Sequence, residues 1–154
     1  MEVKIVKEKT LYRGIIRGWL IGADGKLKDY FEFENLVVDT GLEYLADREL
    51  PTPAMDVMSH YAIGSGSTAP VAGNTTLETE LARATLDSVT RDGKKTVYTA
   101  AFLPGVGTGT IREAGPFNAA AAGTMLARSV YTTPVTKGAS DTYITTHEIE
   151  KIAV

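Results

Sequence analysis

Two Asp-Gly pairs, each set between segments that alternate apolar and polar residues, constrain the fold of this chain most. An Asp-Gly pair favours the type I′ turn, because both central residues of that turn have positive φ angles, and such a turn joins two antiparallel strands. The pairs are Asp24-Gly25, between expected strands at 11–21 and 27–38, and Asp92-Gly93, between expected strands at 84–90 and 96–102. The sequence therefore predicts two β-hairpins.

The return strand of the first hairpin shows the alternation most clearly. Phe31 and Phe33 alternate with Glu32 and Glu34. Because successive side chains of a strand point to opposite faces, this order predicts one buried face and one face in water. Further strands are expected at 59–63, 110–113, 124–131 and 141–152, and loops at 103–109 and 132–140.

Helix signals are few. A capping box, Thr40 with Glu43, predicts a helix that ends before the prolines at 51 and 53. A second capping box, Thr75 with Glu78, predicts a short helical turn. The buried face of the first helix is expected to be the apolar stripe Leu42, Leu45, Ala46 and Leu50.

The stretch Thr110–Tyr131 contains two of the expected strands and the segment between them. A tight turn is predicted at Ala114-Gly115-Pro116, because glycine adopts conformations that other residues resist and proline fixes the exit of the chain. Phe117 is expected to anchor this corner in the core. The run Ala119–Ala122 is expected to form either a close-packed contact or an exposed tip.

Short strands at regular spacing with one or two short helices predict an all-β single domain, a β-sandwich or jelly roll. The chain has 154 residues, 44% hydrophobic and 23% charged, which suits a domain that buries its own core. Residues 1–10 are expected to be an extended arm or a frayed terminus, and residues 11–154 the sandwich domain.

Composition excludes several classes of function. The chain has no Cys, which excludes disulfide scaffolds, Cys-ligated zinc and thiol catalysis. No apolar run approaches the ~18 residues of a membrane span, and the first ten residues lack the apolar segment of a signal peptide. We therefore expect neither a membrane anchor nor a leader.

Charge is distributed unevenly along the chain. Residues 1–28 contain seven Lys and Arg against three Asp and Glu, whereas residues 29–92 contain three against twelve. A basic first segment beside an acidic middle segment could orient like subunits, or the charges could simply solvate unrelated strand faces. Basic residues this dispersed are a poor nucleic-acid signal, and no direct nucleic-acid partner is expected.

The candidate catalytic groups do not form a recognisable constellation. His60 and His147 lie far apart, and each is expected to be a hydrogen-bonded strand residue; the alternation slips near His147, which predicts a bulge or a sheet edge there. Ser65 lacks the flanking glycines of a nucleophile elbow. The Gly105, Gly107 and Gly109 run lacks the lysine and the helix that a phosphate loop requires.

The carboxylates are no more suggestive. Glu148 and Glu150 share a strand face and could couple, but a solvated face is the simpler interpretation. Arg112 and Glu113 are charged candidates for a pair between strands or subunits. Trp19 and the seven tyrosines are scattered over many strands, which suits a core better than a sugar-binding platform. We predict no catalytic, cofactor-binding or metal-binding residues and no enzymatic activity.

Four blocks in order resemble small virion proteins of tailed bacteriophages. They are a helix start N-x-V-x-x-x-G-L, a G-x-G-x-T-x-P loop, an I-x-E-x-G-x-F-N turn with a G-T-M-L-A-R strand, and a P-x-x-K loop before a closing strand. In this chain they lie at Asn35–Asp47, Tyr61–Arg83, Ile111–Asn118 with Gly123–Arg128, and Pro134–Lys137.

The resemblance implies a non-enzymatic structural protein of the virion. The chain has no repeat-rich shaft, so it is closer to a capsid decoration (cement) protein, on the capsid exterior and in contact with the major capsid protein, than to a tail fibre. A tail fibre or baseplate adaptor, or a receptor-binding module of the tail, is the alternative. A homo-oligomer is expected, and we favour a trimer over a dimer.

Overall fold

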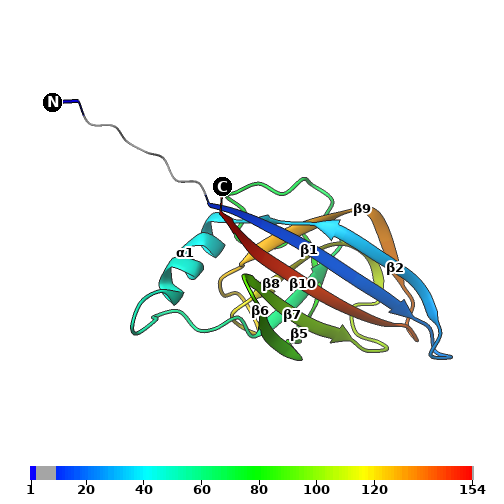
Figure 1. Ribbon diagram of the computed structural model, residues 1–154. Coiled ribbons are helices and arrows are strands. Elements are labelled where there is room, and N and C mark those ends of the chain that lie inside the picture. Colours follow the sequence, from blue (N-terminus) through cyan, green and yellow to red (C-terminus); the bar gives the residue numbers. More distant parts are fainter. Residues whose placement is uncertain (3–9, 154) are drawn as a thin grey trace.

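The chain folds into two antiparallel β-sheets packed face to face, which confirms the all-β sandwich prediction (Figure 1). The computed structural model describes residues 1–2 and 10–153. Within these residues the strands are β1 (Thr10–Ile21), β2 (Leu27–Glu34), β3 (Leu36–Val37), β4 (His60–Gly64), β5 (Glu80–Thr85), β6 (Ser88–Asp92), β7 (Lys95–Phe102), β8 (Gly109–Phe117), β9 (Ala127–Lys137) and β10 (Thr142–Ala153), and the helix is α1 (Asp39–Arg48).

Each sheet has five strands in the described part of the chain, in the orders β2-β1-β10-β7-β6 and β3-β9-β8-β4-β5. Both predicted hairpins form, but the predicted type I′ turns are wrong, because only Gly25 (φ 77°) and Gly93 (φ 57°) have positive φ angles in these turns and Asp24 and Asp92 do not. The prediction of a single strand at 84–90 is wrong. These residues are divided between β5 and β6, because the chain passes from one sheet to the other between those strands.

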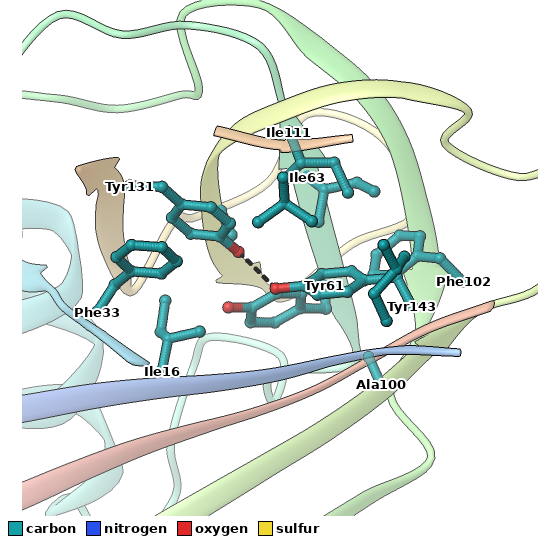
Figure 2. Close-up of a cluster of buried hydrophobic side chains, with 12 residues drawn as sticks. Ile16, Phe33, Tyr61, Ile63, Ala100, Phe102, Ile111, Tyr131 and Tyr143 are labelled. Carbon is teal, nitrogen blue, oxygen red and sulfur yellow. Dashed lines mark hydrogen bonds between the residues drawn. The ribbon is translucent and has the colours of Figure 1, made fainter. Parts of the chain in front are cut away.

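Aromatic and aliphatic side chains from both sheets fill the space between them (Figure 2). The predicted inward position of Phe33 is confirmed, and its ring stacks on Tyr131 of β9 with centroids 4.3 Å apart. The hydroxyls of Tyr131 and Tyr143 are 2.9 Å apart, which satisfies two polar groups inside the core. These contacts join the edge strand β2 to the facing sheet.

Helix α1 ends before the two prolines as predicted, but its buried face is not the expected leucine stripe. Gly41 and Tyr44 are buried, whereas Leu42 and Leu50 are 40% and 52% exposed. The cause is the close approach of the helix to the chain before β9, where a Cβ at Gly41 would lie 1.8 Å from the Leu126 carbonyl oxygen. The glycine therefore determines which face of the helix packs.

Both capping-box predictions are wrong. Val38 is the N-cap residue and makes no side-chain cap, and the Thr40 hydroxyl donates instead to the Met125 carbonyl oxygen at 2.8 Å. The segment from Thr75 to Glu78 is not helical, because the N–H of Glu78 donates to a buried carboxylate on β8. Tertiary contacts have replaced the local hydrogen bonds that define a capping box.

The turn predicted at Ala114-Gly115-Pro116 is also wrong, because β8 runs straight through it. Gly115 is needed for close packing between strands, since a Cβ there would lie 2.2 Å from the Ala127 carbonyl oxygen. Phe117 is fully buried, as predicted. The segment Ala119–Ala122 lies between β8 and β9, and residues 120–122 are an exposed tip, which settles the two alternatives left open by the sequence.

The last two strands differ from their predictions as well. β9 continues to Lys137 through the expected loop, and it accommodates Pro134 in a bulge where the register jumps from Glu113↔Val130 to Ile111↔Val135. β10 lies inside its sheet with continuous register on both sides, so the bulge or edge predicted near His147 is absent from this described strand. The predicted arm at 1–10 falls outside the described residues except at 1–2 and at Thr10, where β1 begins.

The role of Gly41 gives a direct test. We expect Gly41→Ala to lower the free energy of unfolding by about 2 kcal/mol, because the added methyl group collides with rigid backbone. Gly73→Ala is the matched control, since a Cβ at Gly73 meets no atom within 4 Å. Urea denaturation of the two variants measures the difference, and equal stability would contradict the packing role.

Candidate functional site

The most unusual chemical group in the structure is the carboxylate of Glu113, which is fully buried on β8. Its Oε1 accepts hydrogen bonds from the N–H groups of Gly66 at 2.9 Å and Thr79 at 2.7 Å. Its Oε2 accepts from the N–H of Glu78 at 2.9 Å and from Nε of Arg128 at 3.0 Å. A buried charge is stable only when paired and hydrogen-bonded, and this carboxylate meets both conditions.

This arrangement holds the loop at 65–79 against the sheet. Three backbone N–H groups of the loop converge on one carboxylate, so the loop conformation depends on Glu113. Gly64 and Gly66 permit the approach, because a Cβ on either residue would lie 2.6 Å from Glu113 Oε1. We call this arrangement of Glu113, Arg128 and the loop the buried ion centre.

The sequence identified only part of the buried ion centre. Glu113 was a candidate for a pair between strands, which is confirmed, but its partner Arg128 was not singled out. Arg128 is 2% exposed, and its Nη1 donates to Asn74 Oδ1 at 3.1 Å. The sequence feature that could have identified Arg128 is its position as the one charged residue within Leu126–Tyr131, a largely apolar strand sequence.

Three of the four sequence blocks meet in the buried ion centre. Gly66 comes from the G-x-G-x-T-x-P loop, Glu113 from the I-x-E-x-G-x-F-N block and Arg128 from the G-T-M-L-A-R strand. These three residues are far apart in sequence and touch in the structure. The blocks therefore specify one structural unit.

Removing the charge of Glu113 tests this unit. We expect Glu113→Gln to lower the free energy of unfolding by about 3 kcal/mol, because the buried Arg128 loses its buried counter-charge and keeps only the longer ion pair with Glu78, at 3.8 Å. Hydrogen exchange should speed up at Gly66, Glu78 and Thr79. Glu150→Gln is the control, since its partner Arg13 has a side chain that is 63% exposed, and a solvent-exposed ion pair contributes little. Unchanged exchange in the loop of Glu113→Gln would contradict the anchoring role.

His147 is a second buried polar group, held from two sides. Its Nδ1 lies 3.0 Å from the Tyr61 hydroxyl and its Nε2 lies 2.6 Å from the Asn35 amide nitrogen. The absence of solvent disfavours the charged imidazolium, so burial lowers the pKa of His147 from 6.5 to about 3. The neutral ring acts as a hydrogen-bonded core residue, as the sequence predicted.

The depressed pKa makes stability depend on pH. In the unfolded chain His147 takes up a proton near its ordinary pKa of 6.5, whereas in the folded protein it stays neutral down to about pH 3. Its contribution to stability is complete above pH 6.5 and is lost as the pH falls from 6.5 to 3, by up to ~1.4 kcal/mol per pH unit. Urea denaturation at several pH values gives the free energy of unfolding of the wild type and of His147→Gln. Between pH 6.5 and 3 this free energy should fall more steeply with decreasing pH in the wild type, and parallel curves would contradict the role given to His147.

The remaining sequence candidates serve separate purposes. His60 hydrogen-bonds Ser59 through Nδ1 at 2.8 Å. Glu148 and Glu150 lie on one strand face, and each has its own ion-pair partner, since Arg17 binds Glu148 and Arg13 binds Glu150, each at 2.8 Å. These ion pairs follow from the cross-strand register of β1 and β10, which the sequence did not reveal.

Lys137, in the block P-x-x-K, is also buried. Its Nζ donates to the Leu103 carbonyl oxygen at 3.0 Å, and burial lowers the pKa of this lysine although Asp141 opposes the shift. It thereby ties the end of β9 to the loop at 103–109. This contact accounts for the lysine of the P-x-x-K block.

An apolar groove of ≈460 Å³ lies on the surface between α1, the loop after it, and strands β6 and β7. We call it the helix-side groove. Val57 and Val89 are 61% and 48% exposed within it. Its lining residues are Tyr44, Leu45, Arg48, Val57, Met58, Val89, Thr96, Tyr98 and Lys151.

Helix α1 holds the helix-side groove in shape. The Asp47 carboxylate accepts from the N–H groups of Ala54 at 2.9 Å and Met55 at 3.0 Å, and the bond from Ala54 is the main reason that the pKa of Asp47 is lowered. The Tyr44 hydroxyl accepts from the Met58 N–H at 3.1 Å. The loop that carries Val57 is therefore held in place by hydrogen bonds within the chain.

A second groove, of ≈410 Å³, lies beside the edge strand β2. Its lining combines apolar residues with polar and acidic ones: Phe33, Leu36, Pro70, Val130, Asn35, Thr132, Glu32 and Glu34. We call it the β2-edge groove. The two grooves lie at opposite edges of the same sheet, since β2 and β6 are its outermost strands.

The chain matches no protein-family model, no curated protein and no solved structure. Among the described residues, no three His, Asp or Glu side chains gather closely enough to hold a metal ion. Within the same part of the chain, the structure has no helix with the length and apolarity needed to cross a membrane.

Proposed function

We propose that this protein is a structural component of a tailed-bacteriophage virion, a capsid decoration (cement) protein that binds the capsid exterior and bridges major capsid subunits. The observation that carries the proposal is the helix-side groove, a preformed apolar surface with exposed Val57 and Val89. Apolar surface of this kind, rimmed by polar residues, is typical of protein–protein contacts. The four sequence blocks that resemble phage virion proteins support the same function.

In this proposal the protein acts mechanically, by docking a rigid surface onto the capsid. Helix α1 and the loop that it fixes form a rigid surface, so little conformational entropy is lost on docking. A protein that binds the assembled shell, and not the dissociated subunits, stabilises the shell by mass action. The homo-oligomer, with a trimer favoured, would place several such surfaces on neighbouring capsomers.

Titration of the pure protein against empty expanded capsids tests the proposal. We expect stoichiometric saturation at lattice sites, and absence of binding would refute a decoration role. Virions that lack the protein should retain infectivity but lose DNA on heating or at low magnesium. Virions that stay heat-stable but no longer adsorb to cells would instead support a tail protein.

Charged substitutions in the helix-side groove locate the contact. We expect Val57→Glu and Val89→Glu each to weaken capsid binding by about tenfold or more, because a carboxylate would be buried against the partner. Leu27→Glu is the matched control, since Leu27 is 58% exposed on the first hairpin, away from the groove. Equal losses at all three positions would contradict this location.

The tail alternative has one observation in its favour. The tip at 120–122 is exposed, yet Arg83 holds the segment, because its Nη1 donates to the carbonyl oxygens of Ala119 at 2.9 Å and Ala122 at 2.8 Å. The Arg83 guanidinium also stacks over the Phe117 ring at 3.8 Å. A rigid exposed tip of this kind suits a receptor-binding loop.

A further inference from the structure

We propose that two copies of this chain associate by pairing β6 with β6 of the other copy, antiparallel and about a two-fold axis. This inference rests on the homo-oligomer part of the proposed function and deepens it, because it names the surface and the register that join two subunits. The contact joins subunits in pairs, so it is separate from the contact that a trimer requires. It is tested on the pure protein, without a capsid.

Strand β6 is the outermost strand of its sheet and pairs only with β7. All five of its residues are exposed, so both of its faces are largely open to solvent. Val89 shows this most clearly, because it shares a face with the buried Tyr98 and is still 48% exposed. A strand that is open on both faces and along one edge is a template for a further strand.

The hairpin turn determines the hydrogen-bonding pattern of β6. Gly93 and Lys94 occupy the turn, so Asp92 and Lys95 form the closing pair. In a two-residue hairpin this closing pair is hydrogen-bonded. Bonded and non-bonded pairs alternate along an antiparallel ladder. Every second residue of β6 therefore points its backbone groups toward β7, and the residues between them point theirs toward the open edge.

The residues whose backbone groups point outward are Val89 and Arg91. Each has an N–H and a C=O on the open edge, and no other backbone segment of the described chain bonds to these groups. The other edge of the same sheet is different, because on β2 the Glu34 carbonyl oxygen accepts a hydrogen bond from the Ser129 hydroxyl. Strand β6 is therefore the more open edge of this sheet.

One two-fold register uses all of the outward groups. If Thr90 lies opposite Thr90 of the second copy, then Val89 and Arg91 lie opposite each other twice, and each outward N–H meets an outward C=O. A register centred on Val89 sets Arg91 opposite Asp87, whose N–H already donates to the Thr99 carbonyl oxygen. A register centred on Arg91 sets two guanidinium groups directly opposite each other. The backbone and the charges therefore select the register centred on Thr90.

The side chains agree with this register. On the outer face Ser88 lies opposite Asp92 of the second copy, where its hydroxyl can donate to the carboxylate. On the inner face Arg91 lies opposite Val89, so the aliphatic part of the arginine covers apolar surface while the guanidinium reaches water. No like charges lie directly opposite each other. The edge is thus complementary to a second copy of itself.

The same pairing has a consequence for the helix-side groove. Val89 lines this groove and lies one residue from the proposed axis. The grooves of the two subunits would therefore border one axis, and a dimer would present two copies of the surface that is proposed to bind the capsid. Val57 belongs to the loop after α1 and not to β6, so its substitution separates the two contacts.

Single cysteines test the register, because the chain has no native cysteine. Two Thr90 residues form a non-hydrogen-bonded pair with Cα atoms ~4.5 Å apart, which a disulfide spans. We expect Thr90→Cys to give a covalent dimer on a non-reducing gel after mild oxidation. Ser88→Cys is the matched control on the same face, since two Ser88 residues lie ~13 Å apart along the strand. A mixture of Ser88→Cys and Asp92→Cys should cross-link.

A proline tests the backbone pairing separately. Arg91→Pro removes an outward N–H and leaves the bonds to β7, which an edge strand tolerates. Sedimentation over a concentration series should show a dimer dissociation constant raised by about tenfold or more, because each copy leaves a Val89 carbonyl oxygen unpaired. Arg91→Ala is the matched control, since it removes the same side chain and keeps the N–H. Urea denaturation checks that both variants are folded.

Four outcomes would overturn the proposal. They are a wild type that stays monomeric, no cross-link in Thr90→Cys, an equal cross-link in Ser88→Cys, and an Arg91→Pro variant that dimerises as strongly as Arg91→Ala. A monomeric wild type whose capsid binding is lost in Arg91→Pro would assign the edge to the capsid protein. Val57→Glu in the Thr90→Cys chain should still cross-link, so a failure of the decoration role is distinguished from a failure of this pairing.

Discussion

The structure depends on a single buried carboxylate. Glu113 receives three backbone N–H groups and one guanidinium N–H, and in this way it connects β8, β9 and the loop at 65–79. An isolated carboxylate in this place would cost many kcal/mol, so the surrounding donors are a condition for folding. The glycines at 64 and 66 follow from it, since no other residue leaves room for the carboxylate oxygens.

Close backbone contacts require glycine at two further positions of the fold. Gly41 lets α1 touch the Leu126 carbonyl, and Gly115 lets β8 touch the Ala127 carbonyl, so both glycines pack against one short stretch of chain that leads into β9. The helix is thereby rotated, and two leucines that periodicity assigns to the core are left in water. Exposed apolar surface at the helix end is a consequence of this packing.

How much of this could be predicted from the sequence depended on whether the signal was local. The Asp-Gly hairpins and the alternation of Phe31 and Phe33 are local, and both predictions were confirmed. Errors arose where a residue serves a distant partner. Thr40 bonds to Met125 and not to its own helix. The inward positions of β10 include the polar residues Thr145 and His147, so the alternation of apolar residues is interrupted although the strand is continuous.

The buried ion centre shows the same limit. Its members are far apart in the chain, and neither the charge of Glu113 nor that of Arg128 distinguishes a buried residue from a surface one. Geometry was needed to show that Gly66, Glu113 and Arg128 meet in one set of contacts.

The arrangement of the surfaces follows from the arrangement of the core. The ionisable groups of the core are held by partners within the chain, while the two grooves are at the surface. The two grooves lie at opposite edges of one sheet, and they differ in character, since the helix-side groove is apolar with Arg48 and Lys151 and the β2-edge groove carries Glu32 and Glu34.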